Sequence, residues 1–188
     1  GQALQLPADF IAEGLDQTRG WFYTLLVLGV ALFDQAAFKN VLVSGIVVAK
    51  DGKKMSKRLQ NYTAPDALMA KSGADALRLY LIHSGLVKAQ SQRFDDQGVI
   101  EMTRKVCLPW YNAVNFLKTY AEVDGWTTAN REPSNHILDS WLQSRVNHLT
   151  ATIEGELTRY ALYAVVPELL RFLEDLTNVY IRLNRSRF

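Results

Sequence analysis

The sequence contains little that would suit an exported or membrane protein. It has a single cysteine, Cys107, which excludes an internal disulfide and fits a reducing compartment. The longest uncharged apolar run, Trp21 to Phe33, is shorter than the roughly 20 residues that a bilayer-crossing helix needs. No secretory signal pattern is visible. We therefore expect a cytoplasmic protein with no membrane partner.

A strong excess of charge of either sign is also missing. The 21 Lys and Arg residues nearly balance the 19 Asp and Glu residues, so the formal net charge is +2. Any contact with nucleic acid must therefore come from local clusters of basic residues. The histidines His83, His136 and His148 lie far apart and have no Cys, Asp or Glu at metal-binding spacing, so no metal site is predicted. Hydrophobic residues make up 48% of the chain, which is enough for a packed core.

The first third of the chain has a strand–helix–strand pattern. Residues 10–12 form a short apolar run that predicts a buried strand, and Asp16 is placed to cap a helix through residues 21–32. The β-branched run from Val41 to Val48 predicts one further strand. Such a unit implies a parallel sheet with a right-handed crossover. Two strands cannot form a stable sheet alone, so we expect the remaining strands outside this chain or in its poorly marked ends.

Helical patterns dominate the rest of the chain. Short helices are predicted at residues 66–71 and from 73 onward, and a long one from 95 to 121 that Pro109 should kink or restart. Residues 122–134 are rich in turn-forming residues and read as a linker. Two more amphipathic helices follow, over 138–153 and 163–180, with Pro167 as an expected kink in the second. The fold class is therefore α/β followed by all-α.

A basic cluster follows the second predicted strand, where open α/β sheets bind their ligands. Four cations fall between Lys53 and Arg58, after Gly52. A cluster of this kind is also typical of a solvated basic loop, but Met55 and Ser56 stand among these cations, which a merely basic tract does not require. Residues 54–58, Lys-Met-Ser-Lys-Arg, resemble the KMSKS signature of class I aminoacyl-tRNA synthetases. Arg58 replaces the more common final serine.

A second motif narrows the resemblance. Residues 13–22, Glu-Gly-Leu-Asp-Gln-Thr-Arg-Gly-Trp-Phe, are similar to the EGxDQxRGWF segment of isoleucyl-tRNA synthetases. The layout also suits a polar ligand, because Gly14 permits close backbone approach, Asp16 can accept hydroxyl groups, and a helix N-terminus offers free N–H groups. Without the motif, Asp16 could be only a helix cap and Trp21 only a core aromatic.

The resemblance implies roles for particular residues. In such a synthetase Glu13, Gly14, Asp16 and Gln17 would hold the aminoacyl-adenylate. Glu13, Gln17 and Trp21 would form the amino-acid pocket. The backbone of Gly45, Ile46 and Val47 would read the adenine. Lys54 and Lys57 would be catalytic, within an ATP-binding loop of Lys54, Met55, Ser56, Lys57 and Arg58. Arg182, Arg185 and Arg187 form a short basic end that could contact tRNA phosphates, although a solvated helix face explains them equally well.

The resemblance also implies a fold and a reaction. Residues 1–63 would be the second half of a Rossmann-type catalytic domain, 64–121 a helical stem-contact region, 122–134 a linker and 135–188 the start of an anticodon-binding helix bundle. The whole enzyme would couple isoleucine to ATP, supplied with Mg²⁺, and transfer it to tRNA(Ile). Its other half, which bears a His-Ile-Gly-His-like motif, and its editing domain are expected outside this fragment, which alone should be inactive.

Two alternatives stay open. The chain could be a non-catalytic RNA-binding module derived from a synthetase, although its near-neutral charge argues against that. It could also come from a related class I enzyme for valine or leucine, although Trp21 after Arg19-Gly20 favours isoleucine. Arg58, Asn61 and Tyr62 look more like the eukaryotic or archaeal enzymes.

Overall fold

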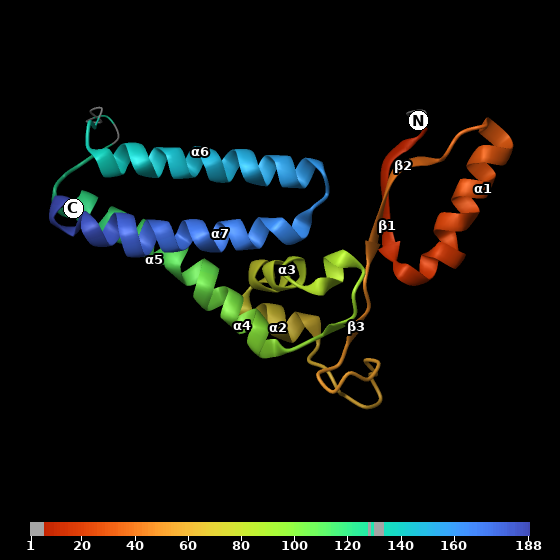
Figure 1. The fold of residues 1–188 in the computed structure, drawn as a ribbon. Helices are drawn as coiled ribbons and strands as arrows, with labels where there is room; N and C mark the ends of the chain where they lie inside the picture. The colour runs from red at the N-terminus through yellow and green to blue at the C-terminus, as the bar shows by residue number, and fades with distance from the viewer. Residues whose placement is uncertain (1–5, 128, 130–133) are drawn as a thin grey trace. The chain divides into compact units, whose positions relative to one another are not determined.

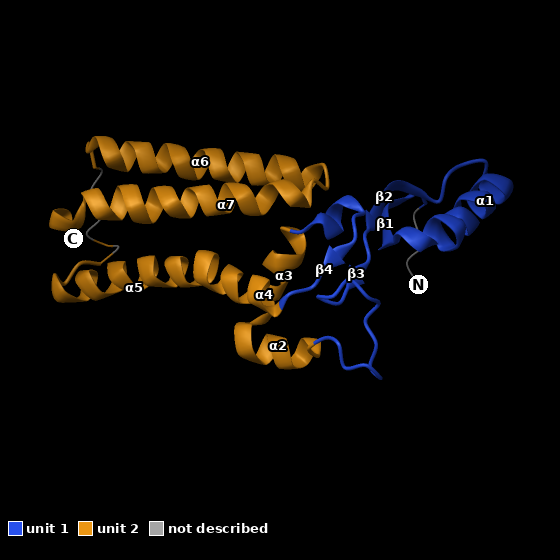
Figure 2. Cartoon of the chain, turned by 60° about the horizontal axis from the view of Figure 1, so that its bottom comes forward, with its two compact units in different colours: residues 1–62, 84–95 blue, residues 63–83, 96–188 orange. Residues whose placement is uncertain are grey.

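The computed structural model describes residues 6–127, 129 and 134–188 of the chain (Figure 1). Its contacts divide the chain into two compact units (Figure 2). Unit 1 comprises residues 1–62 and 84–95, and unit 2 comprises residues 63–83 and 96–188. This division separates the chain near the predicted boundary at residue 63, but it returns residues 84–95 to the first unit. The four predicted domain ranges stay a prediction about the longer protein.

Unit 1 contains the predicted strand–helix–strand arrangement. Strand β1 (Ala8–Gly14) leads through a tight turn (Leu15–Arg19) into helix α1 (Trp21–Phe33), and strand β2 (Phe38–Ser44) follows. The two strands pair in parallel, in a register that runs from Ala8 opposite Phe38 to Gly14 opposite Ser44. The parallel pairing is therefore confirmed. The prediction of a buried first strand holds only for Ile11, which is 5% exposed, because its neighbour Phe10 is 50% exposed.

The predicted single strand from 41 to 48 is wrong, because the chain breaks it after Ser44. Strand β3 (Val47–Val48) leaves β2 and pairs in parallel with β4 (Gln92–Arg93). The break occurs where residues 84–95 pack against Gly45: its N–H donates to the carbonyl of Leu86 at 2.8 Å. A Cβ at Gly45 would lie 1.8 Å from the backbone oxygen of Gln90, so only glycine fits.

Unit 2 is helical. Its first helices are α2 (Pro65–Ser72) and α3 (Ala74–Ile82), which match the two short predicted helices. Helix α4 (Asp96–Met102) continues through a π-helical segment (Thr103–Cys107) into α5 (Leu108–Val123). The expected interruption therefore lies just before Pro109. Proline has no N–H to donate to the preceding turn, and a local widening of the helix accommodates that missing bond.

The last helices are α6 (Ile137–Thr158) and α7 (Val165–Glu174), which lie side by side (Figures 1 and 2). A second π-helical segment (Asp175–Ile181) extends α7. The predicted kink at Pro167 is wrong: Pro167 lies in the first turn of α7, where its missing N–H costs no helical bond. The unit's core includes Val99 and Val166, both fully buried.

The linker begins later than predicted, because α5 continues to Val123. Linker positions 128 and 130–133 lie outside the described residues. Within the described part of the chain, no helix has the length and apolar character that crossing a membrane requires.

Candidate functional site

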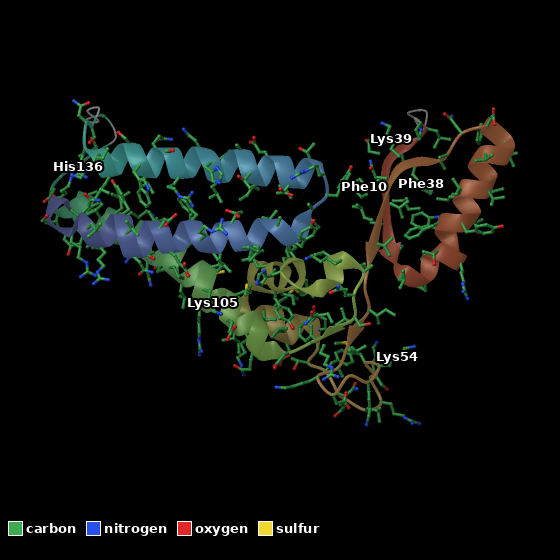
Figure 3. All side chains as sticks on the ribbon, in the orientation of Figure 1. Phe10, Phe38, Lys39, Lys54, Lys105 and His136 are labelled. Carbon is green, nitrogen blue, oxygen red and sulfur yellow. The ribbon has the colours of Figure 1, made fainter. Side chains whose placement is uncertain are left out.

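Two of the predicted segments follow parallel strands of unit 1, the first after β1 and the second after β3. Strands β1 and β2 end opposite each other at Gly14 and Ser44. The turn over residues 15–19 follows β1, and β2 leads through β3 into the loop that carries Lys54 (Figure 3). Ligands of parallel α/β sheets bind beyond the carboxyl ends of strands. Each motif thus follows the carboxyl end of a parallel strand, which is where a ligand would bind.

Gln17, rather than Asp16, caps the helix after β1. Asp16 lies in the 3-10 turn that precedes the helix, and the N-cap position of α1 is Gly20. The Trp21 N–H donates to Gln17 Oε1 at 2.9 Å. The other end of the same amide, Gln17 Nε2, donates to Asp16 Oδ2 at 3.1 Å. The predicted Asp16 cap is therefore wrong, and Gln17 fixes both the Asp16 carboxylate and the start of α1.

Trp21 and Glu13 present accessible side chains next to this turn. Trp21 is 47% exposed, and its ring centroid lies 6.3 Å from that of the buried Phe22. Glu13 is exposed, and its backbone carbonyl accepts a long hydrogen bond from Ser44 Oγ at 3.4 Å. Both side chains can thus contact a ligand without a change in the core.

The segment Gly45–Val47, predicted to read adenine, is partly engaged within the unit. The Gly45 N–H is bonded to Leu86, and the Ile46 carbonyl accepts from the N–H of Gln92 at 2.9 Å. A carbonyl oxygen has two lone pairs, so the Ile46 oxygen can accept one further donor. The Gly45 N–H is not available in this way, and the adenine contact stays a prediction.

The base of the basic loop is held by backbone contacts. The Ala49 N–H donates to the Lys53 carbonyl at 2.8 Å, Val48 and Lys54 form an antiparallel bridge, and Gly52 turns the chain with φ of 82°. The left-handed conformation at Gly52 favours glycine. The base therefore places Lys54 directly beside the end of β3.

The cations of the loop fall into two groups. Lys50 pairs with Asp95 at 3.0 Å, and Lys53 lies 3.7 Å from Asp51. Three others are exposed and have no ion pair among the residues that the structure describes, and these are Lys54, Lys57 and Arg58. These three belong to the signature, and their charged groups face solvent.

Met55 and Ser56 are half-buried, and Asn61 holds the loop behind them. Asn61 Oδ1 accepts from the Ser56 N–H at 2.9 Å, and Asn61 Nδ2 donates to the Lys54 carbonyl at 3.2 Å. Sequence analysis assigned Asn61 no role in this loop. In the sequence, Asn61 is only an amide side chain a few residues beyond the motif. Such side chains are too common to predict that this one would bind the backbone of the loop.

The predicted tRNA-contacting arginines lie at the end of unit 2, and one of them is already paired. Arg187 Nη2 lies 2.7 Å from Asp139 Oδ2, and Tyr180 and Ser134 donate to the same carboxylate. The Arg187 guanidinium holds the pKa of Asp139 well below its usual range. Arg187 is thus used in an internal contact, whereas Arg182 and Arg185 are exposed.

No group of three or more His, Cys, Asp or Glu side chains that could hold a metal ion occurs within residues 6–127, 129 and 134–188.

Comparison with known proteins identifies the family. Residues 2–93 match the family model for class I tRNA synthetases (I, L, M and V). The chain is 56% identical over 183 residues to the isoleucine–tRNA ligase of Bdellovibrio bacteriovorus, an alignment that covers 97% of this chain and 17% of that protein. The chain belongs to the class I tRNA synthetases. It is also 50% identical to a probable cytoplasmic isoleucine–tRNA ligase of Dictyostelium discoideum, covering 96% of this chain and 18% of that protein.

Solved structures of class I synthetases share the fold. The methionyl-tRNA synthetase of Mycobacterium tuberculosis, bound by methionyl-adenylate, matches with a TM-score of 0.75 at 18% identity, over 97% of this chain and 35% of that one. A LeuRS of Agrobacterium radiobacter K84, in a ternary complex with tRNA and LeuAMS, matches with a TM-score of 0.68 at 21% identity, over 96% and 23%. The expected fold class is thereby confirmed. The chain spans less than a fifth of the length of its curated relatives.

Proposed function

We propose that the full-length protein containing this chain activates isoleucine with ATP and transfers it to tRNA(Ile). The observation that carries the proposal is the presence in unit 1 of two motifs, each of which follows a parallel strand. The turn at residues 14–17 and the loop at residues 54–58 both follow the carboxyl ends of parallel strands, and three loop cations have no partner among the described residues. The names of the 50–56% identical relatives support isoleucine as the amino acid.

In the proposed reaction a carboxylate oxygen of isoleucine attacks the α-phosphorus of ATP. The bond from that phosphorus to the bridging oxygen breaks, and pyrophosphate leaves with the bonding electrons. Lys54 and Lys57 neutralise the charge that develops on the pyrophosphate, which is catalysis by positioned electrostatics. Mg²⁺ enters with ATP as part of the substrate. A terminal hydroxyl of the tRNA then attacks the acyl carbon of the adenylate, and AMP leaves.

The first motif would hold the adenylate. The Asp16 carboxylate, which accepts from Gln17, would accept ribose hydroxyls, and the exposed Glu13 would accept from the adenylate. Trp21 would form one wall of the isoleucine pocket. Gln17 makes one internal hydrogen bond at each end of its amide, so one Nε2 proton and one Oε1 lone pair would be left for the adenylate or the amino acid.

The test is amino-acid-dependent exchange of pyrophosphate into ATP by the full-length protein, with isoleucine, valine and leucine compared. We expect the fastest exchange with isoleucine. Fastest exchange with valine or leucine would assign the chain to one of those enzymes instead. Absence of exchange with every amino acid, together with retained tRNA binding, would favour a non-catalytic RNA-binding module.

A further inference from the structure

The Asn61 side chain joins two backbone groups of the signature loop. Its amide accepts from the Ser56 N–H at 2.9 Å and donates to the Lys54 carbonyl at 3.2 Å. The partners dictate this orientation of the amide, because an N–H must meet the oxygen and a carbonyl must meet the NH₂ group. Asn61 is half-buried, whereas Lys57 and Arg58 in the turn before it are exposed.

Together with two backbone features, this contact fixes the part of the loop that carries Lys54 and Lys57. Upstream, the bridge between Val48 and Lys54 ties the loop to β3. Downstream, Gln60 adopts a left-handed conformation with φ of 47°, which turns the chain so that Asn61 follows it back towards Lys54. The segment between Ser56 and Asn61 is therefore closed at its base by a side chain, and Lys57 directly follows the clamped Ser56.

The chemistry of the clamp requires asparagine. Aspartate would keep the acceptor for the Ser56 N–H but would place a carboxylate oxygen against the Lys54 carbonyl, which offers no proton. Alanine would lose both bonds. Because Lys54 and Lys57 are exposed and without ion pairs in the described part of the chain, their positions depend on the backbone that carries them.

We propose that Asn61 is a positioning residue for the activation step: its amide clamps the loop so that Lys54 and Lys57 are directed to the departing pyrophosphate, and it does not itself contact the nucleotide. This inference rests on the proposed function. Misplacing a catalytic group by about 1 Å can reduce a rate by roughly 100-fold, so loss of the clamp should act on the rate of activation.

The test compares Asn61→Ala and Asn61→Asp with a matched control in the full-length protein. The control is Asn40→Ala, because Asn40 Nδ2 also donates to a backbone carbonyl, that of Asp9 at 2.9 Å, but on the β1–β2 pair and away from the loop. In isoleucine-dependent pyrophosphate exchange, we expect kcat to fall by roughly 10- to 100-fold for both Asn61 variants. The KM for isoleucine and the melting temperature should stay close to those of Asn40→Ala.

A double-mutant cycle with Lys57→Ala separates positioning from an independent effect. If Asn61 acts through the loop, the loss in the double variant is smaller than the product of the two single losses. Full multiplicative losses would overturn the proposal, as would wild-type exchange by Asn61→Ala. Should the alanine variant fail to fold, Asn61→Asp carries the test, and failure of both to fold would make Asn61 a folding residue instead. If the unaltered protein shows no exchange with any amino acid, the proposed function itself fails.

Discussion

Replacement of Lys57 by alanine tests the electrostatic part of the proposed mechanism. The Lys57 side chain is exposed and makes no ion pair within the residues that the structure describes, so its removal breaks no ion pair there. Lys53, four positions earlier in the same loop, carries the same charge but lies 3.7 Å from Asp51. Lys53→Ala is therefore the matched control for the loss of one positive charge from this loop.

The rate losses expected for Lys57→Ala and Lys53→Ala differ enough to distinguish a catalytic lysine from a general effect of charge. Removal of a single charge about 10 Å from a phosphate in water changes their Coulomb interaction energy by roughly 0.4 kcal/mol, and salt screens this interaction further. The exposed Lys53–Asp51 pair contributes at most about 1 kcal/mol. A preorganised donor that meets charge developing in the transition state contributes about 2–4 kcal/mol. Lys57→Ala should thus slow exchange by roughly 30- to 1,000-fold, and Lys53→Ala by only a few-fold.

The assay is isoleucine-dependent exchange of pyrophosphate into ATP by the full-length protein, at two salt concentrations. Binding of isoleucine should change little in Lys57→Ala, because the loss acts on the transition state. Equal losses in Lys57→Ala and Lys53→Ala, reduced together by salt, would reduce the role of the loop to general attraction of ATP. Normal exchange in Lys57→Ala would remove Lys57 from the mechanism.

Three further predictions concern other parts of the chain. Trp21→Ala should raise the KM for isoleucine far more than that for ATP, and equal rises would indicate damage to the fold; Trp21 is already 47% exposed, so little stability should be lost. Gly45→Ala should lower the free energy of unfolding by about 1–3 kcal/mol, because the new Cβ meets the Gln90 backbone oxygen. An unchanged melting temperature would contradict this contact. Asp139→Asn should destabilise the protein in urea at pH 7. Because Arg187 lowers the folded-state pKa of Asp139, the ionised carboxylate stabilises the fold above the unfolded pKa of about 3.9, and this contribution is lost as the pH falls further. The gap between wild type and variant should therefore shrink below about pH 3.9, and a constant gap would refute the pairing.

The sequence by itself determined the local elements and the two motifs. The apolar runs and their spacing predict the parallel strand–helix–strand unit and the following helices, because secondary structure follows from side chains close together in the chain. The motifs at residues 13–22 and 54–58 identify the family on residue types alone. The comparisons confirm that identification.

Only the tertiary structure decided which distant residues contact the predicted site residues. The strand at 41–48 is divided because residues 84–95 return to pack on Gly45 and pair with β3. The pairing of Lys50 with Asp95 separates one lysine from its neighbours in the loop. Arg187 is engaged by Asp139, from the first turn of α6. Periodicity and propensity carry no information about which distant group will meet a given side chain, and that choice is made by packing.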